Sequence, residues 1–338
     1  MAPTERRRTM SDNAGGVARK HHYVPQCYLK HFTHDRSKKS QLYVVDAPRR
    51  RAFWTTPSNI AAERDFNRID GEDPNVIEAM YADFEAKLAP VLVRADTRRG
   101  QVDDADLAIL LEMVALFAVR SPRRREHLRQ FYEHSTRTIM DQALATRERW
   151  ESQVRRAVAD GFMAPPKVSY EDMKAFVDSG EYRIDVTTTR HVATELELLP
   201  VVYNLLHERR WAVLRASAES GGFVTSDNPT TLCWDDANLE GGFYPPGFGA
   251  TGTSVVCPLS KTLAIRGSFD GRDGVLEVPP DLVAAINTRT IALADRQIYA
   301  QNDRFEFVGP DNKVGRGDAL LSRLTAVLRT AAPAGEPS

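Results

Sequence analysis

The sequence predicts an α+β fold, in which a helical middle section packs on a mostly antiparallel sheet formed by N- and C-terminal segments. Two long regions, residues 73–158 and 189–207, carry apolar side chains at helical spacing. Short apolar runs of strand length occur before them, within 42–55, and again after residue 210. The chain contains no internal repeat, so these elements are expected to form a single domain.

The composition is that of a globular protein. The chain has 338 residues, of which 42% are hydrophobic and 27% are charged. We expect residues 20–330 to form the folded domain, residues 1–19 a flexible leader and residues 331–338 a flexible tail.

Charge and cysteine content exclude several classes of protein. The formal net charge is −1, so no overall field attracts the chain to nucleic acid or to a membrane. No apolar stretch approaches the roughly 20 residues of a membrane-spanning helix, and no signal peptide is evident. The three cysteines are widely separated and form no CxxC pair. A reducing cytoplasmic location without membrane partners is therefore expected.

The elements are expected in the following order. Pro25 begins a short helix that extends to Phe32, and the runs 42–45 and 52–55 form a hairpin. Asp73 and Pro74 open a helix with an inward stripe, and a second, central helix spans 104–120. The stripe comprises Ile77, Met80, Tyr81, Phe84, Leu88 and Val91. Further helices are predicted over 123–158, 170–177, 189–207, 281–294 and 318–328, and strands over 211–214, 222–225, 253–256, 263–265 and near 305–307.

The segment from His21 to Phe32 is the first candidate for chemistry, because four of the eight histidines lie between His21 and His34. Histidine transfers protons and binds metals near neutral pH. Neighbouring residues of an extended segment point to opposite faces, so either His21 or His22 is expected to serve a site while the other packs. The alternative is that both are structural. Gln26 adds an amide near the same place.

The segment Ser226-Asp227-Asn228-Pro229 is the second candidate, because it presents a hydroxyl, a carboxylate and an amide after a strand. The alternative is an Asx turn that fixes the loop. A serine hydrolase is not predicted, because the flanks lack the Gly-x-Ser-x-Gly elbow.

Carboxylates and arginine could complete a site. Glu78 and Glu85 are seven residues apart and therefore share one helix face. They can bind a divalent cation with a histidine, or they can form ion pairs at a helix edge. Arg120 can bind an anion, or it can complement the C-terminal end of its helix.

The chain resembles the DUF4238 family of domains of unknown function over about residues 20–302. The likeness is carried by the following segments: His21-His22-Tyr23-Val24-Pro25-Gln26-x-Tyr28-Leu29-x-x-Phe32, Ala62-Glu63-Arg64-Asp65-Phe66, the helix with Glu78 and Glu85, Ser226-Asp227-Asn228-Pro229, and Asn287 to Tyr299. Cys27 and Asn67 depart from the family pattern, where an aromatic residue and a tyrosine are usual. The resemblance implies an approximate fold but no established activity. It favours one shared, solvent-reachable site for His21, His22, Asp227 and Asn228.

A metal-assisted phosphoester hydrolase or nuclease is the leading functional prediction. His22, Glu85 and Asp227 would hold a divalent metal, Mg²⁺ or Mn²⁺, and Arg120 would clamp a phosphate-bearing ligand or nucleic acid. His21 or His22 would act as the base. The alternative is a non-catalytic module that binds a ligand or a partner. HNH nucleases share a His-His-x-x-Pro order, but no histidine lies between His34 and His127 to complete such a site.

Overall fold

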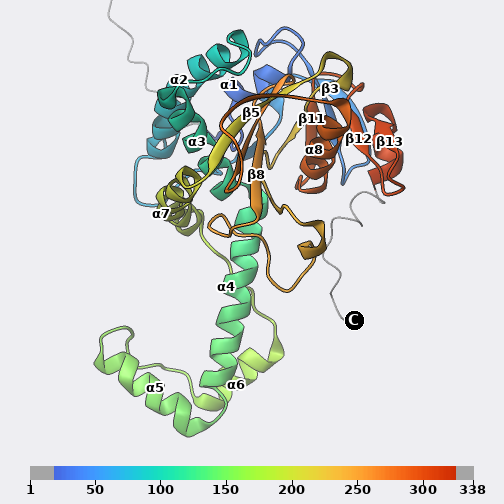
Figure 1. Cartoon of the computed structure of the whole chain (residues 1–338). Helices are drawn as coiled ribbons and strands as arrows, with labels where there is room; N and C mark the ends of the chain where they lie inside the picture. Colours follow the sequence, from blue (N-terminus) through green and yellow to red (C-terminus); the bar gives the residue numbers. More distant parts are fainter. Residues whose placement is uncertain (1–18, 325–338) are drawn as a thin grey trace, which may run out of the picture.

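The structure is a computed structural model that describes residues 19–324 (Figure 1). Residues 1–18 of the expected leader, the expected tail and the last part of the expected terminal helix lie outside this range. The helices are α1 (Gln26–Leu29), α2 (Val76–Thr97), α3 (Asp104–Val119), α4 (Pro122–Ala143), α5 (Arg147–Ala159), α6 (Tyr170–Ser179), α7 (Thr188–His207) and α8 (Pro280–Ala292). The strands are β1 (Lys20–His22), β2 (Leu42–Asp46), β3 (Arg51–Thr55), β4 (Ala62–Arg64), β5 (Arg210–Ala216), β6 (Thr225–Ser226), β7 (Thr231–Trp234), β8 (Thr253–Pro258), β9 (Leu263–Ser268), β10 (Gly274–Val278), β11 (Gln297–Ala300), β12 (Glu306–Val308) and β13 (Val314–Arg316).

Two main sheets form the centre, and the α+β prediction is confirmed. A five-stranded sheet has the order β10-β5-β9-β8-β7, and a four-stranded sheet has the order β3-β2-β11-β6. Every pair in these two sheets is antiparallel except β10 with β5. The four-stranded sheet combines both ends of the chain, because β11 lies between the N-terminal β2 and the short β6.

Both faces of the five-stranded sheet are covered. Trp211 and Val213 of β5 join the core that also contains buried residues of α1, α2, α3 and α7. Ala212 and Leu214 point to the other face and join Val283 of α8. Figure 1 shows α2, α3 and α7 on one side of the strands and α8 on the other. The sheet is therefore a central layer between helices.

The helices differ from the sequence expectations in three details. The predicted helix over 123–158 is two helices, because Thr146 caps the start of α5 by accepting a hydrogen bond from the Arg149 N–H. These helices and α6 do not pack on the sheet but form an arm that leaves the body (Figure 1). In α4, which is about 33 Å long at 1.5 Å per residue, no residue is buried. Helix α2 starts at Val76, and Met80 of its expected inward stripe is 40% exposed.

The N-terminal helix is confirmed and anchors the body. Tyr28, Leu29 and Phe32 are fully buried. The Tyr28 hydroxyl donates to the Pro258 carbonyl at 2.7 Å and lies 2.7 Å from the Thr225 hydroxyl. One phenol thereby ties α1 to strands of both main sheets.

Replacing Tyr28 with phenylalanine should therefore destabilise the protein without changing its shape. The ring contacts remain, but the Pro258 carbonyl loses its buried donor, which costs about 1–3 kcal/mol. Urea denaturation measures the change. The exposed Tyr244 serves as the control, and Tyr244→Phe is expected to be neutral. Equal stabilities for Tyr28→Phe and the unsubstituted protein would contradict the anchoring role.

Neither a membrane span nor a disulfide is found in the described part of the chain. Within residues 19–324, no helix combines the length and apolar character that crossing a bilayer requires. Cys27, Cys233 and Cys257 are buried free thiols.

Candidate functional site

A pocket of about 210 Å³ brings together five of the residues that the sequence singled out: His22, Gln26, Glu78, Glu85 and Arg120. We call it the His22 pocket. Its other lining residues are Lys38, Tyr81 and Ala82. It therefore combines an imidazole, two carboxylates, a phenol, an amide and two cationic side chains in one small hollow.

Short elements from distant parts of the sequence position these side chains. Strand β1 pairs with β4 so that His21 is buried and His22 is only partly buried. Helix α1 starts at Gln26, directly after Pro25. Glu78, Tyr81 and Glu85 are three and four residues apart on α2 and so share one face. Arg120 is the C-cap residue of α3.

Arg120 is a buried cation without a carboxylate partner. Its side chain is 2% exposed, and no ion pair to its guanidinium is formed within residues 19–324. One amino group donates to the His22 carbonyl at 2.7 Å, and the guanidinium stacks 3.7 Å from the centre of the Tyr81 ring. Its Nε has no hydrogen-bond partner in the described structure. The carboxylates of Glu78, Glu85 and Glu195 act on this charge without a direct ion pair, so an anion that contacts the guanidinium directly would be stabilised.

His22 and Glu85 are both displaced toward their neutral forms. Burial, with a contribution from Lys20, lowers the pKa of His22. Burial raises the pKa of Glu85, although the charges of Lys38 and Arg120 oppose this effect. The His22 Nε2 is also buried without a hydrogen-bond partner in the described chain. A neutral imidazole and a protonatable carboxyl group in one pocket are suited to general acid–base chemistry.

His21 lies behind the pocket rather than in it. It is completely buried, and its Nδ1 accepts a hydrogen bond from the Asn67 backbone N–H at 2.8 Å. The Asn67 side chain donates to Glu78 at 2.5 Å. His21 and Asn67 thus hold the β4 end against α2 and orient Glu78.

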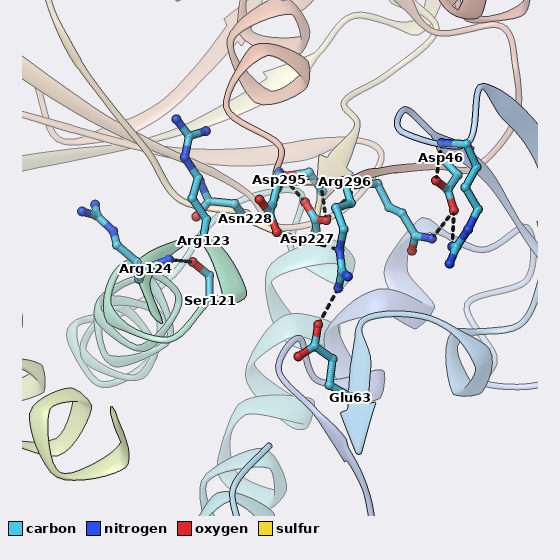
Figure 2. A network of polar contacts seen from close by, with 12 residues as sticks. Asp46, Glu63, Ser121, Arg123, Arg124, Asp227, Asn228, Asp295 and Arg296 are labelled. Atoms are coloured by element: carbon cyan, nitrogen blue, oxygen red, sulfur yellow. Dashed lines mark hydrogen bonds and ion pairs between the residues drawn. The ribbon is translucent and has the colours of Figure 1, made fainter. Parts of the chain in front are cut away.

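The Ser226-Asp227-Asn228 turn does not line this pocket, so the expected single hollow for His21, His22, Asp227 and Asn228 is not formed. Asp227 is 1% exposed, and its carboxylate accepts hydrogen bonds of 2.7–2.9 Å from the backbone N–H groups of residues 295–297 (Figure 2). Burial raises its pKa to about 6, and these three hydrogen bonds oppose the shift. Asn228 donates a side-chain hydrogen bond to the Leu293 carbonyl and a backbone hydrogen bond to the buried Ser226 hydroxyl. These contacts match the structural alternative, a turn that fixes the loop.

A second polar pocket of about 380 Å³ lies beside this turn, with Tyr23, Asp46, Glu63 and Arg296 among its walls. Its charged groups are paired with one another. Arg296 contacts Glu63 at 2.5 Å, and Asp46 accepts from Arg49 and Gln297 (Figure 2). The His22 pocket, whose arginine is unpaired, is therefore the stronger candidate for a ligand site.

The expected metal ligands do not form a set. Of the three, His22 and Glu85 line one pocket, whereas both oxygens of the Asp227 carboxylate are occupied by backbone donors elsewhere. No group of three or more His, Cys, Asp or Glu side chains arranged to hold a metal occurs in residues 19–324. The donor set therefore does not fit the expected Mg²⁺ or Mn²⁺ site.

Two residues of the pocket were not recognised as functional from the sequence. Tyr81 was assigned to the packing stripe, but its hydroxyl is buried without a partner within the described chain, and it lines the pocket. Its spacing from Glu78 and Glu85 was a usable signal. Lys38 lies in an irregular loop, and no sequence pattern indicates its position at the exposed edge of the pocket.

Comparison with known proteins gives a family without a known activity. The model of the family described as "Protein of unknown function (DUF4238)" matches residues 20–304 of the 338-residue chain. The chain belongs to the DUF4238 family. No curated protein and no solved structure matches the chain. Membership confirms the resemblance, and the DUF4238 match includes every residue of the His22 pocket.

Replacing Glu85 with glutamine should stabilise the protein at neutral and alkaline pH. Because burial raises the folded-state pKa of Glu85 above the value of about 4.3 in an unfolded chain, the folded form binds this proton more tightly. The unsubstituted protein therefore loses stability as the pH rises from the Glu85 pKa of the unfolded chain to that of the folded protein. At pH values above the folded-state pKa, this loss persists. Glutamine cannot ionise and so avoids this loss. The free energy of unfolding of the variant should therefore exceed that of the unsubstituted protein at pH 8 but not at pH 4.

Urea denaturation at both pH values measures this difference. Asp83→Asn is the matched control, because Asp83 is exposed on the same helix and lies outside the pocket. A Glu85→Gln variant that is less stable than the unsubstituted protein at pH 8 would contradict the conclusion that burial of the Glu85 carboxylate costs stability.

Proposed function

We propose that the His22 pocket is the active site of a hydrolase that acts on a small phosphoester. The observation that carries the proposal is the buried Arg120 guanidinium, which has no carboxylate partner in the described chain and lines a pocket with acid–base groups. A phosphoryl group supplies a negative charge in direct contact with the guanidinium, and guanidinium geometry suits phosphate oxygens. The pocket volume of about 210 Å³ favours the phosphoryl group of a small molecule over a folded nucleic acid.

Each side chain of the pocket has a separate role in the proposed reaction. Arg120 binds the non-bridging phosphoryl oxygens, and Lys38 at the exposed edge adds a second positive charge. His22, as a neutral imidazole, takes a proton from the water that attacks phosphorus. Glu85, whose pKa is raised, gives a proton to the oxygen of the leaving group. Gln26 and the Tyr81 hydroxyl are placed to orient the substrate.

A substrate panel tests the proposal. Purified protein is incubated with p-nitrophenyl phosphate, with nucleoside phosphates and with short DNA and RNA strands, and released phosphate or fragments are measured. We expect turnover of a small phosphoester. His22→Gln and Glu85→Gln should each reduce it about 10²–10⁴-fold, whereas Asp83→Asn should not.

Two outcomes would redirect the proposal. Turnover should survive EDTA, and loss that Mg²⁺ or Mn²⁺ restores would mean that a divalent ion joins His22 and Glu85. Binding of inorganic phosphate without turnover of any substrate would favour the alternative, a non-catalytic ligand-binding module.

We also retain the expectation of a reducing cytoplasmic location, which three buried free thiols support.

A further inference from the structure

A separate cavity of about 360 Å³ lies where the arm joins the body. We call it the α3–α7 cavity, because the end of α3, the start of α4, helix α7 and the Phe248 loop form its walls. Its apolar walls are Ala118, Val119, Leu128, Leu198, Val202 and Phe248. It shares no lining residue with the His22 pocket, so an occupant here would be distinct from the proposed substrate.

The charged groups of this cavity leave a positive charge at its edge. Arg125 makes a bidentate ion pair with Glu195 at 2.6 and 3.0 Å and also donates to the Phe66 carbonyl, so this pair contributes no net charge. Arg124 lies at the exposed edge, and its guanidinium has no acidic partner within residues 19–324. In Figure 2 it points away from the Asp227 network. The edge is therefore positive while the walls are apolar.

His191 adds a polar group inside this cavity. Its side chain is 8% exposed, and Nδ1 is buried with no hydrogen-bond partner in the described structure. Burial, together with the nearby Arg125 charge, lowers its pKa to about 4, so the ring is neutral at pH 7. The second histidine of the cavity is His127, and burial together with Arg123 and Arg124 lowers its pKa as well. The positive charge at the edge thus belongs to Arg124.

We propose that the α3–α7 cavity binds a small amphipathic carboxylic acid. The apolar chain of the acid lies against the walls, its carboxylate meets Arg124 at the edge, and the His191 ring offers a polar contact inside. An uncharged apolar molecule would leave Arg124 and the His191 Nδ1 without new partners, so the carboxylate should distinguish the preferred ligand. This site is independent of the proposed hydrolysis.

Calorimetric titration with octanoate and with 1-octanol tests the proposal, since the two probes share a chain and differ in charge. We expect octanoate to bind one to one and at least about 10-fold more tightly than 1-octanol, as expected for a charge-assisted contact worth about 1.4 kcal/mol or more. Arg124→Gln should remove this difference while leaving the weaker binding of the alcohol unchanged. The matched control is Arg149→Gln, which removes an exposed arginine from the same arm.

A second variant does not depend on the charge. Leu198 is 45% exposed at the cavity, so Leu198→Trp should be tolerated by the fold and should block both probes. The proposal is overturned if unsubstituted protein binds neither probe, if it does not prefer octanoate, or if folded Leu198→Trp binds octanoate unchanged. Thermal melting of each variant verifies folding, and the Leu198→Trp result decides the question if Arg124→Gln does not fold.

Discussion

Replacing Arg120 with methionine is expected to abolish phosphate binding at the His22 pocket while leaving the fold intact. A charge-assisted hydrogen bond to an anion contributes about 1.5–3 kcal/mol, and at least two are expected from one guanidinium, so the dissociation constant should rise 100-fold or more. Methionine keeps a flexible apolar stem in the place of the arginine stem. The substitution removes a buried charge, but it also removes the donor to the His22 carbonyl and the stacking on Tyr81. The melting temperature of the variant is therefore measured together with its phosphate affinity.

Titration with inorganic phosphate measures this effect, alongside turnover of whichever phosphoester the panel identifies. Arg68→Met is the matched control, because Arg68 is half-exposed and lies outside the pocket. Arg120→Lys should recover part of the affinity, since it restores the charge without the planar group. Unchanged phosphate affinity in a folded Arg120→Met protein would remove the basis of the proposed site.

Replacing Asp227 with asparagine is expected to lower the free energy of unfolding by about 1–3 kcal/mol at pH 8 without affecting the chemistry of the pocket. The loss of backbone hydrogen bonds is expected to exceed the gain from no longer burying the charge, whose burial raises the pKa to about 6. The carboxylate accepts three backbone hydrogen bonds from residues 295–297, so both of its oxygens are in use. Asparagine replaces one oxygen with an amino group that faces N–H donors. Leaving buried donors unsatisfied costs about 1–3 kcal/mol each.

Urea denaturation at pH 8 measures this loss, and Asp295→Asn is the control. Asp295 lies in the same turn, but its carboxylate makes only a 3.9 Å contact with Arg296, so its replacement should cost about 0.5 kcal/mol or less. If folded Asp227→Asn instead kept full stability and lost turnover, Asp227 would belong to the chemistry after all.

Local pattern was sufficient for some elements and not for others. The hairpin of β2 and β3 follows from two apolar runs around a turn, and the structure has it with the expected pairing. Strand β11 was missed because its four residues form a strand by pairing with β2 and β6, both distant in sequence. The break between α4 and α5 was missed because Leu144 and Ala145 suit a helix, although Thr146 is a good N-cap residue.

The candidate site was predictable where one helix face or one short motif defines it. His22, Gln26 and Glu85 were recognised from such patterns, and they line the same pocket with Arg120. The role of Asp227 could not be decided from the sequence, because a turn that binds backbone and a turn that binds substrate use the same residue types. Only the N–H groups of residues 295–297, which follow 68–70 residues later, distinguish the two.

The pairing of β2 with β11 also bears on how the protein is made. Gln297 donates to Asp46 across 251 positions of the chain, so the N-terminal hairpin has no sheet neighbour until β11 has left the ribosome. At roughly 5–20 residues per second, translation of that stretch takes about 12–50 s. During this interval the nascent hairpin has an unpaired strand edge, which is a site where another chain could pair and aggregation could begin.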